Sequence, residues 1–170
     1  MSQVYLSLGT NLGQRRLNLQ RAVRMLGEGV AVAAVSPVYE TDPWGETEQP
    51  AFLNLCLAAK AELQPETLLA FIKQIEAQMG RQKTTRWGPR LIDIDILFYD
   101  DRVIDNDRLI IPHPHIAERA FVLAPLADIA PNLVHPLTGR TVSQMLRNVD
   151  LTAVRRQKAP LWEEAVDGTI

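Results

Sequence analysis

Two carboxylates, Asp93 and Asp95, stand one residue apart in the sequence LIDIDILFY of residues 91–99. This mostly apolar run lies between Gly88-Pro89 and Asp100-Asp101, a pattern that predicts a β-strand. Side chains of a strand alternate between its two faces, so both aspartates point the same way, roughly 6.5–7 Å apart. Two carboxylates this close repel each other unless a positive charge lies between them. The alternation predicts that the opposite face carries Ile92, Ile94, Ile96 and Phe98.

A divalent metal ion is the simplest source of that charge. Mg²⁺ prefers oxygen ligands and usually binds one or two carboxylates together with substrate phosphates. Two such ions can share a carboxylate pair when they hold a reacting phosphate. Arg86 and Arg90 offer planar groups that match phosphate oxygens, and Trp87 offers a stacking surface. Acids that are solvated or paired with these arginines are the alternative, but the combination favours a site for a metal-bound polyphosphate.

The composition narrows the class of function. The chain has 170 residues, of which 46% are hydrophobic and 22% charged, and its net charge is −2. That balance gives no support to a broadly basic nucleic-acid-binding surface. The lone cysteine, Cys56, excludes an internal disulfide framework and a cysteine-cluster zinc site, and its apolar neighbours predict a buried thiol.

The length and the terminal segments limit the domain organisation that the chain can have. The N-terminus lacks the segments of a secretion signal, and no stretch approaches the roughly 20 apolar residues of a membrane span. We therefore expect a cytoplasmic protein without membrane contact. We expect a single domain over residues 1–150 and an appended, poorly ordered tail over residues 151–170.

Hydrophobic periodicity predicts alternating strands and helices. Strands are expected at residues 4–8, 30–39, 52–63 and 91–99, and helices at residues 11–26, with Asn11 as N-cap, 65–79 and 119–129. The first six elements follow the βαββαβ order of a ferredoxin-like core, an α/β (α+β) fold with a mostly antiparallel sheet flanked by helices. Two long loops, residues 41–50 and 81–89, are expected to be mobile binding elements.

Further residues could take part in chemistry. His113 lies between two prolines, so contact with phosphate or acid/base catalysis competes with the role of a solvated histidine. Arg81 and Lys83 begin a run of cations that ends at Arg90, whereas Glu76 could be an ordinary exposed acid. The turn of residues 9–13 matches no nucleotide-binding fingerprint, and we interpret it as structural.

Several motifs together resemble one family. They are RWGPR with DID, GTN at residues 9–11, the loop of residues 39–45, FLN at 52–54, IPH at 111–113 and RAFVL at 119–123. In their order along the chain they are similar to the 6-hydroxymethyl-7,8-dihydropterin pyrophosphokinases of folate biosynthesis, from about residue 4 to residue 149. The resemblance implies transfer of the β,γ-pyrophosphoryl group of ATP to the pterin hydroxymethyl, with release of AMP. It also implies two Mg²⁺ ions, with ATP as co-substrate.

The resemblance assigns roles to individual residues. It implies metal binding by Asp93 and Asp95. It implies catalytic roles for Arg81, Arg90, Asp95 and His113. It places ATP contacts at Gln74, Glu76, Lys83, Arg86, Trp87, Ile96, Arg108, His113 and Arg119. It places the pterin pocket at Thr41, Asp42, Pro43, Trp44, Phe52, Asn54, Asp93 and Phe121, with Phe52 or Phe121 stacking on the ring.

The implied partners are small molecules, ATP and 6-hydroxymethyl-7,8-dihydropterin, and the product would pass to dihydropteroate synthase. No nucleic acid or membrane partner is expected, and nothing demands more than a monomer. This chain departs from the family pattern at Asp42, which adds a negative charge to the first loop. Two alternatives remain: another Mg²⁺-dependent phosphotransferase or nucleotidyltransferase, and a non-catalytic RNA-binding module, which carboxylates on the sheet disfavour.

Overall fold

A central antiparallel sheet organises the chain, and the computed structural model describes residues 1–43, 48–80 and 91–162. The strands follow the order β5-β1-β4-β3-β8, and β2 pairs with β4 on the same side as β3. Their bounds are β1 Ser2–Thr10, β2 Ala31–Val35, β3 Tyr39–Thr41, β4 Phe52–Ala61, β5 Asp93–Tyr99 and β8 Val154–Arg156. Alternate residues of β1 are buried, as expected of a strand with one face in the core.

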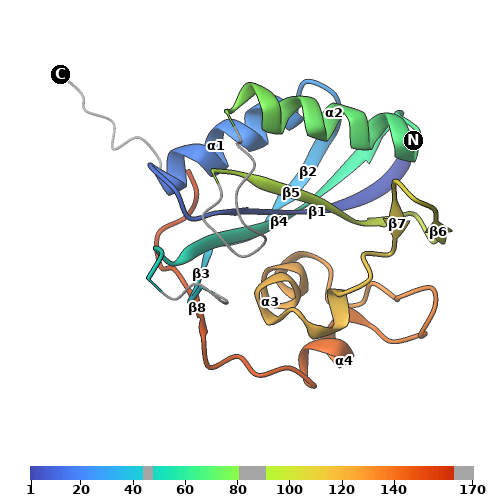
Figure 1. The fold of residues 1–170 in the computed structure, drawn as a ribbon. Helices are drawn as coiled ribbons and strands as arrows, with labels where there is room; N and C mark the ends of the chain where they lie inside the picture. Colours follow the sequence, from blue (N-terminus) through green and yellow to red (C-terminus); the bar gives the residue numbers. More distant parts are fainter. Residues whose placement is uncertain (44–47, 81–90, 163–170) are drawn as a thin grey trace, which may run out of the picture.

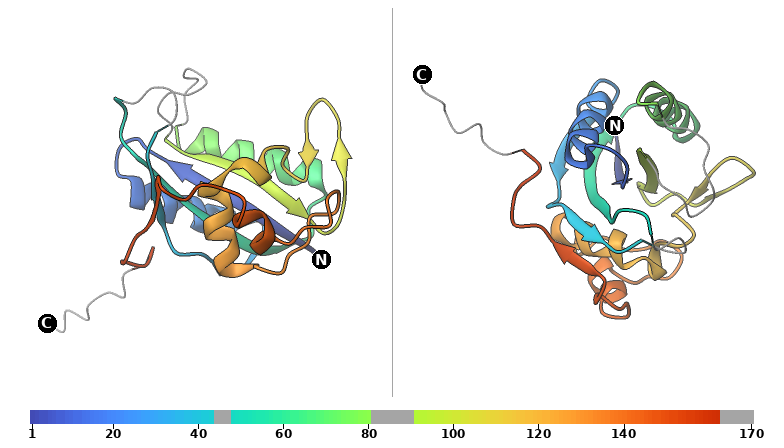
Figure 2. Two further views of the ribbon diagram at one scale, coloured as in Figure 1. Left: turned by 90° about the horizontal axis from the view of Figure 1, so that it is seen from below. Right: turned by 60° about the vertical axis from the view of Figure 1, so that its left-hand side comes forward.

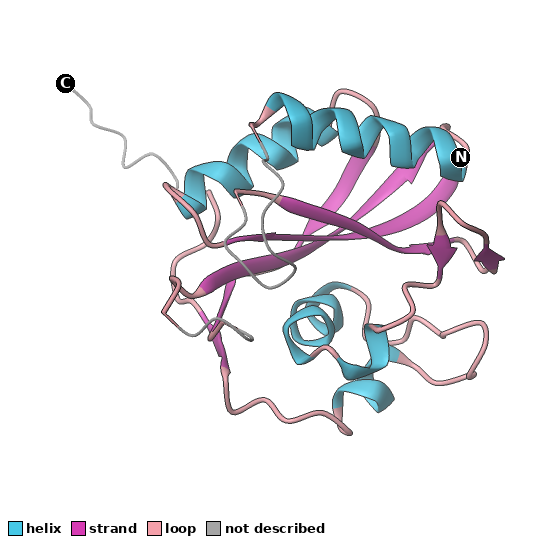
Figure 3. Ribbon diagram, viewed as in Figure 1, coloured by secondary structure: helices cyan, strands magenta, loops and turns pink. Residues whose placement is uncertain are grey.

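Helices cover both faces of the sheet (Figures 1 and 3). On one face lie α1 (Arg15–Leu26) and α2 (Pro65–Gln78), and on the other lie α3 (Ala120–Ile129) and α4 (Val142–Leu146). A 3₁₀ turn, Ile116–Glu118, precedes α3, and the short strands β6 (Ile104–Asp105) and β7 (Ile110–Ile111) form a hairpin after β5. None of the helices in the described parts is long and apolar enough to span a bilayer.

The first six expected elements form the predicted ferredoxin-like core. The chain runs β1, α1, β2 with β3, β4, α2, β5, and the outer strands flank the central pair β1 and β4. The strand expected at residues 30–39 is two strands, because residues 36–38 interrupt the pairing with β4. The fold class predicted from the sequence, an antiparallel sheet flanked by helices, is confirmed.

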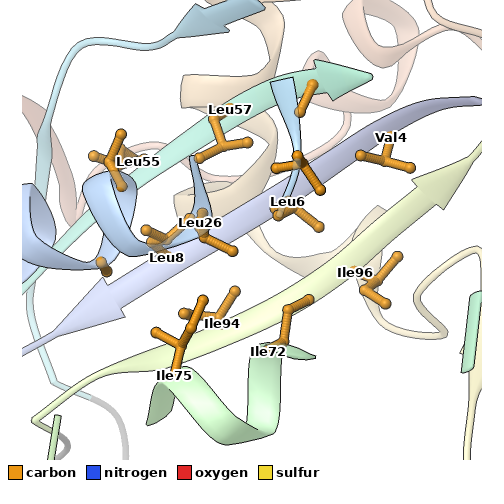
Figure 4. Close-up of a cluster of buried hydrophobic side chains, with 14 of the residues drawn as sticks. Val4, Leu6, Leu8, Leu26, Leu55, Leu57, Ile72, Ile75, Ile94 and Ile96 are labelled. Carbon is orange, nitrogen blue, oxygen red and sulfur yellow. The ribbon is translucent and has the colours of Figure 1, made fainter. Parts of the chain in front are cut away.

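Hydrophobic side chains fill both spaces between the sheet and the helices. Figure 4 shows the larger cluster, in which Leu6 and Leu8 of β1 meet Leu26 of α1 and Ile72 of α2. On the opposite face, a second cluster joins β5 to α3 and α4. Removal of this apolar surface from water is the main force that holds the helices against the sheet.

A β-bulge in β5 corrects the predicted face of Phe98. Leu6 pairs with Ile96 but Tyr5 pairs with Phe98, so Leu97 is an extra residue on β5. The extra residue reverses the alternation beyond Ile96. Phe98 therefore lies in the cluster beneath α3, whereas Ile92, Ile94 and Ile96 face α1 and α2 as predicted.

The start of α1 differs from the prediction that Asn11 caps it. The helix begins at Arg15 with Gln14 as N-cap, and no side chain caps it. The Asn11 amide is buried and donates instead to Gln49 Oε1 at 2.8 Å and to the Pro50 carbonyl at 3.0 Å. Asn11 thus ties the end of β1 to the segment before β4.

Residues 154–162 of the expected tail pack on the sheet and on α1. Val154–Arg156 form β8, the strand next to β3, and Leu161 is buried in the larger hydrophobic cluster. Figure 2 shows this last described segment, coloured red, passing along the edge of the sheet. Its contacts with residues far away in the sequence are the reason that local patterns did not reveal it.

The core makes a direct stability prediction. Leu6→Ala, at a fully buried position, should lower the free energy of unfolding by about 3 kcal/mol, because it removes apolar contacts and leaves a cavity. Urea unfolding measures the change. Leu137→Ala is the control, since Leu137 is 66% exposed, and it should change the free energy of unfolding by less than about 0.5 kcal/mol. Equal effects of the two substitutions would contradict the core described here.

Candidate active site

Asp93 and Asp95 project from β5 on the face that carries α3. They lie opposite Gly9 and Ser7 of β1, and both side chains are partly exposed. His113 and Arg119 approach the same carboxylate: His113 Nε2 lies 3.9 Å and Arg119 Nη1 lies 4.0 Å from Asp95 Oδ2. The structure therefore brings together four of the predicted site residues, from β5 and from the segment that leads into α3.

The backbone around the bulge positions His113. The His113 N–H donates to the carbonyl of Leu97, the extra residue of β5, at 3.0 Å. The His113 Nδ1 accepts from the His115 N–H at 3.2 Å. A neutral imidazole that accepts through Nδ1 carries its proton on Nε2, the atom that faces Asp95. Burial and the nearby Arg119 lower the pKa of His113 to about 4, so it is a neutral donor at physiological pH.

Arg119 adds a permanent positive charge beside the carboxylates. It immediately precedes α3, and its guanidinium carbon lies 5.8 Å from the centre of the Phe121 ring. A guanidinium over an aromatic ring is stabilised by the negative face of the ring. Arg119 and His113 both direct N–H groups toward Asp95. A negatively charged ligand oxygen beside Asp95 can accept hydrogen bonds from them.

The carboxylate pair suits a metal ion held jointly with a ligand. Burial and the adjacent Asp93 carboxylate raise the pKa of Asp95 to about 7, and Arg119 opposes the increase only in part. Within the described residues there is no cluster of three or more His, Cys, Asp or Glu that could enclose a metal by itself. A pair of carboxylates with room for phosphate oxygens is the donor set that Mg²⁺ uses in phosphoryl-transfer sites, so these residues fit Mg²⁺.

Glu76 is not the ordinary exposed acid that the sequence allowed. It is only 2% exposed, its Oε2 accepts from the Ile94 N–H at 3.2 Å, and its Oε1 lies 3.2 Å from Lys73 Nζ. The carboxylate thereby satisfies a backbone donor of β5, an edge strand of the main sheet in the described structure. It also contributes to the raised pKa of Asp95.

The other predicted ATP contacts lie in different places. Gln74 is exposed on α2, and Ile96 is buried in the core beneath α1 and α2. Arg108 is exposed on the turn between β6 and β7, where its N–H donates to Asn106 Oδ1. Several predicted residues lie outside the described parts of the chain: Trp44, Arg81, Lys83, Arg86, Trp87 and Arg90.

A second group of predicted residues surrounds Asn54 on β4. Its amide is buried and donates to the Thr41 hydroxyl on β3. Phe52 begins the same strand and is partly exposed, as is Pro43 after β3. Asp42 is exposed, and its Oδ1 lies 3.1 Å from Arg155 Nη2.

Gly9 links the two groups, a role that sequence analysis missed. It lies within β1, opposite both Asn54 on β4 and Asp93 on β5. A Cβ atom at this position would lie 2.8 Å from Asn54 Oδ1, closer than such atoms normally approach. The missing side chain lets the Asn54 amide lie close to the backbone of β1. A glycine within a strand pattern signals such a close approach, and that signal could have found it.

Repulsion between the Asp93 and Asp95 carboxylates predicts that removing one of the two charges will stabilise the folded protein. Because the pKa of Asp95 rises from 3.8 to about 7 on folding, its ionisation destabilises the folded state as the pH rises through this range. In metal-free buffer at pH 8, Asp95→Asn should therefore increase the free energy of unfolding by about 1 kcal/mol, a value reduced for partial solvent exposure. The difference should shrink toward pH 4. Urea unfolding with a chelator at both pH values tests this, and a less stable variant at pH 8 would contradict it.

Comparison with known proteins shows the family. The family model described as 7,8-dihydro-6-hydroxymethylpterin-pyrophosphokinase (HPPK) matches residues 5–131. A 2-amino-4-hydroxy-6-hydroxymethyldihydropteridine pyrophosphokinase of Methylorubrum extorquens is 45% identical over 158 residues, which cover 92% of this chain and 99% of the relative. The Aquifex aeolicus protein of the same name is 44% identical over 137 residues, covering 81% of this chain and 86% of its own length.

A solved structure shares the fold. The wild-type HPPK-DHPS of Plasmodium falciparum aligns with a TM-score of 0.69 and 18% sequence identity, over 86% of this chain and 44% of that chain. This chain thus spans less than half of that protein. The motif set, the sheet order and the relatives agree, and the chain belongs to the 7,8-dihydro-6-hydroxymethylpterin pyrophosphokinase family.

Proposed function

We propose roles for the site residues in the reaction of this family, transfer of a pyrophosphoryl group from ATP to 6-hydroxymethyl-7,8-dihydropterin in folate biosynthesis. Asp93 and Asp95 hold two Mg²⁺ ions together with the phosphates of ATP. When bound, these ions neutralise phosphate charge and orient the transferring group. The observation that carries this assignment is the convergence of Asp95, His113 and Arg119 within 4.0 Å on one face of the sheet.

His113 and Arg119 bind triphosphate oxygens in this proposal. His113 donates through Nε2 while remaining neutral, and Arg119 supplies a charge-assisted donor fixed at the start of α3. Donors that are already in place cost little reorganisation as negative charge develops on the phosphate. The predicted ATP contact of Arg108, which is exposed on the β6–β7 turn, remains a prediction. The predicted roles of Arg81, Arg90, Lys83, Arg86 and Trp87 remain predictions.

The pterin binds beside Asn54 in this proposal. A side-chain amide has two N–H donors and a carbonyl acceptor, and the bond to Thr41 uses one of the donors. The remaining groups match the donor and acceptor edge of the pterin ring. Phe52 or Phe121 stacks on the flat heterocycle, and Asp93 lies across Gly9 from Asn54, near the hydroxymethyl that must be activated.

The product is expected to pass to a dihydropteroate synthase. The Plasmodium falciparum HPPK-DHPS supports this proposal, since its name combines HPPK with DHPS in one protein. The expected monomeric state and cytoplasmic location remain predictions.

Phosphorus NMR of the protein with ATP, Mg²⁺ and 6-hydroxymethyl-7,8-dihydropterin tests the assignment. AMP and a pterin pyrophosphate should accumulate, and both should be absent without the pterin. Asp95→Ala should reduce kcat by at least about 100-fold, because it removes a metal ligand beside the transferring group. Asp101→Ala is the matched control, an exposed aspartate beyond the end of β5, and it should retain full turnover. ADP as the product would indicate a different phosphotransferase, and full turnover in Asp95→Ala would remove the metal role.

Gly9→Ala should raise the KM for the pterin by about tenfold, because the new Cβ would displace the Asn54 amide by a fraction of an ångström or more. Steady-state kinetics with saturating ATP measures the change. In an Asn54→Ala background the same substitution should have a much smaller effect, since the clashing oxygen is gone. Equal effects in both backgrounds would show that Gly9 does not act through Asn54.

A further inference from the structure

The C-terminal strand β8 lies outside the part of the chain that the family model matches. That match ends at residue 131, whereas β8 covers Val154–Arg156. β8 pairs along the whole length of β3, with Thr41 opposite Val154 and Tyr39 opposite Arg156. β3 is only three residues long and carries Thr41, the partner of Asn54. The C-terminal segment therefore contacts the strand that forms the proposed pterin side of the site.

The contacts between the two strands continue past the end of β3. The Asp42 N–H donates to the Ala153 carbonyl at 3.3 Å. Arg155 Nη2 lies 3.1 Å from Asp42 Oδ1 and 3.3 Å from Glu40 Oε1, so one guanidinium bridges both acids. Arg15 of α1 also approaches Glu40, at 3.6 Å. Arg155 thus holds the chain on both sides of Thr41. It also compensates the negative charge of Asp42, the residue at which this chain departs from the family pattern.

The residues that follow β8 are anchored on α1. The Gln157 N–H donates to the Val38 carbonyl at 2.8 Å, and its side-chain oxygen accepts from Arg16 at 2.5 Å. Arg16 also donates to the carbonyls of Ala159 and Pro160, and Leu161 is only 4% exposed. With these attachments β8 is a firm support for β3.

We propose that Arg155 is a positioning residue for pterin binding, acting through Glu40 and Asp42 to hold Thr41 beside Asn54. Alternation along β3 places the side chains of Glu40 and Asp42 on the opposite face from Thr41. Arg155 therefore need not touch the substrate. It holds the backbone of β3 from behind while Thr41 and Asn54 face the site. This inference rests on the proposed function, because it takes Asn54 as the group that binds the pterin.

If Arg155 only stabilised the fold, its loss would lower the unfolding temperature; if it positions Thr41, its loss raises the pterin KM instead. The side chains of Arg155 and Asp42 are 50% and 58% exposed, and ion pairs this exposed contribute little to stability. Loss of Arg155 should therefore leave the thermal unfolding temperature almost unchanged. Any effect on the position of Thr41 would still be visible in the KM for the pterin, which separates positioning from folding.

The test compares Arg155→Ala with wild type under saturating ATP. The KM for the pterin should rise two- to five-fold. The kcat and the KM for ATP should stay within about 20% of wild type, and the unfolding temperature within about 1 °C. Arg155→Lys should restore part of the pterin affinity, because lysine keeps the positive charge but lacks the forked guanidinium that reaches both Glu40 and Asp42. Arg140→Ala is the control: it removes the same charge from an exposed position on the loop between α3 and α4, and it should leave the pterin KM unchanged.

Salt provides a second measurement. The difference between Arg155→Ala and wild type should diminish at 1 M salt, where exposed charges are screened. An unchanged pterin KM in Arg155→Ala, or an equal increase in Arg140→Ala, would overturn the role of Arg155, as would an equal increase in the KM for ATP. If wild-type protein forms no AMP and no pterin pyrophosphate, the proposed function itself has failed. Normal wild-type turnover with no effect of Arg155→Ala refutes only the positioning role.

Discussion

The antiparallel pairing of β5 with β1 is the constraint on which the site depends. Leu8 opposite Ile94 sets the register, and that register turns both aspartates of β5 away from α1 and α2. A slip of one residue would bury the carboxylates in the hydrophobic core. The apolar face of β5 therefore fixes the direction of the acidic face, and packing energy enforces the geometry of a polar site.

The bulge at Leu97 adapts this strand to two demands. Before it, alternation keeps Asp93 and Asp95 together on the open face. After it, Phe98 turns toward α3 and meets Tyr5 and His135 edge to face. The carbonyl of Leu97 then accepts the His113 N–H. The same irregularity therefore completes the second hydrophobic cluster and brings the imidazole to the carboxylates.

The charges at the site are not balanced in the protein alone, and this costs the protein stability until a ligand binds. Burial and Asp93 raise the pKa of Asp95, while burial and Arg119 lower the pKa of His113 and keep it neutral. A fully paired cluster would have been more stable and less able to accept a metal with its phosphates. Sites that bind transferring phosphates commonly retain such unbalanced charge, which the ligand then relieves.

Local patterns in the sequence were sufficient for part of this architecture and not for the rest. The period of two over residues 91–96 placed Asp93 and Asp95 together, because that spacing needs no knowledge of a partner strand. The bulge, by contrast, exists only as a mismatch between β5 and β1. The burial of Glu76 depends on an edge strand that runs beneath α2, and the close approach at Gly9 depends on β4. These features arise from tertiary pairing. A strand pattern does not encode the bulge or the burial of Glu76, and at Gly9 it signals a close approach but not the partner strand.

The two sides of the site are supported in different ways. The proposed metal side rests on β5, which pairs six of its seven residues with the central strand β1 and packs on both faces. The proposed pterin side rests on β3, which has three residues and would be an exposed edge without β8. Short edge strands are weakly held and fray easily. A segment from the far end of the chain makes β3 an interior strand, and this explains why hydrogen bonds, ion pairs and a buried leucine all secure so short a piece of sheet.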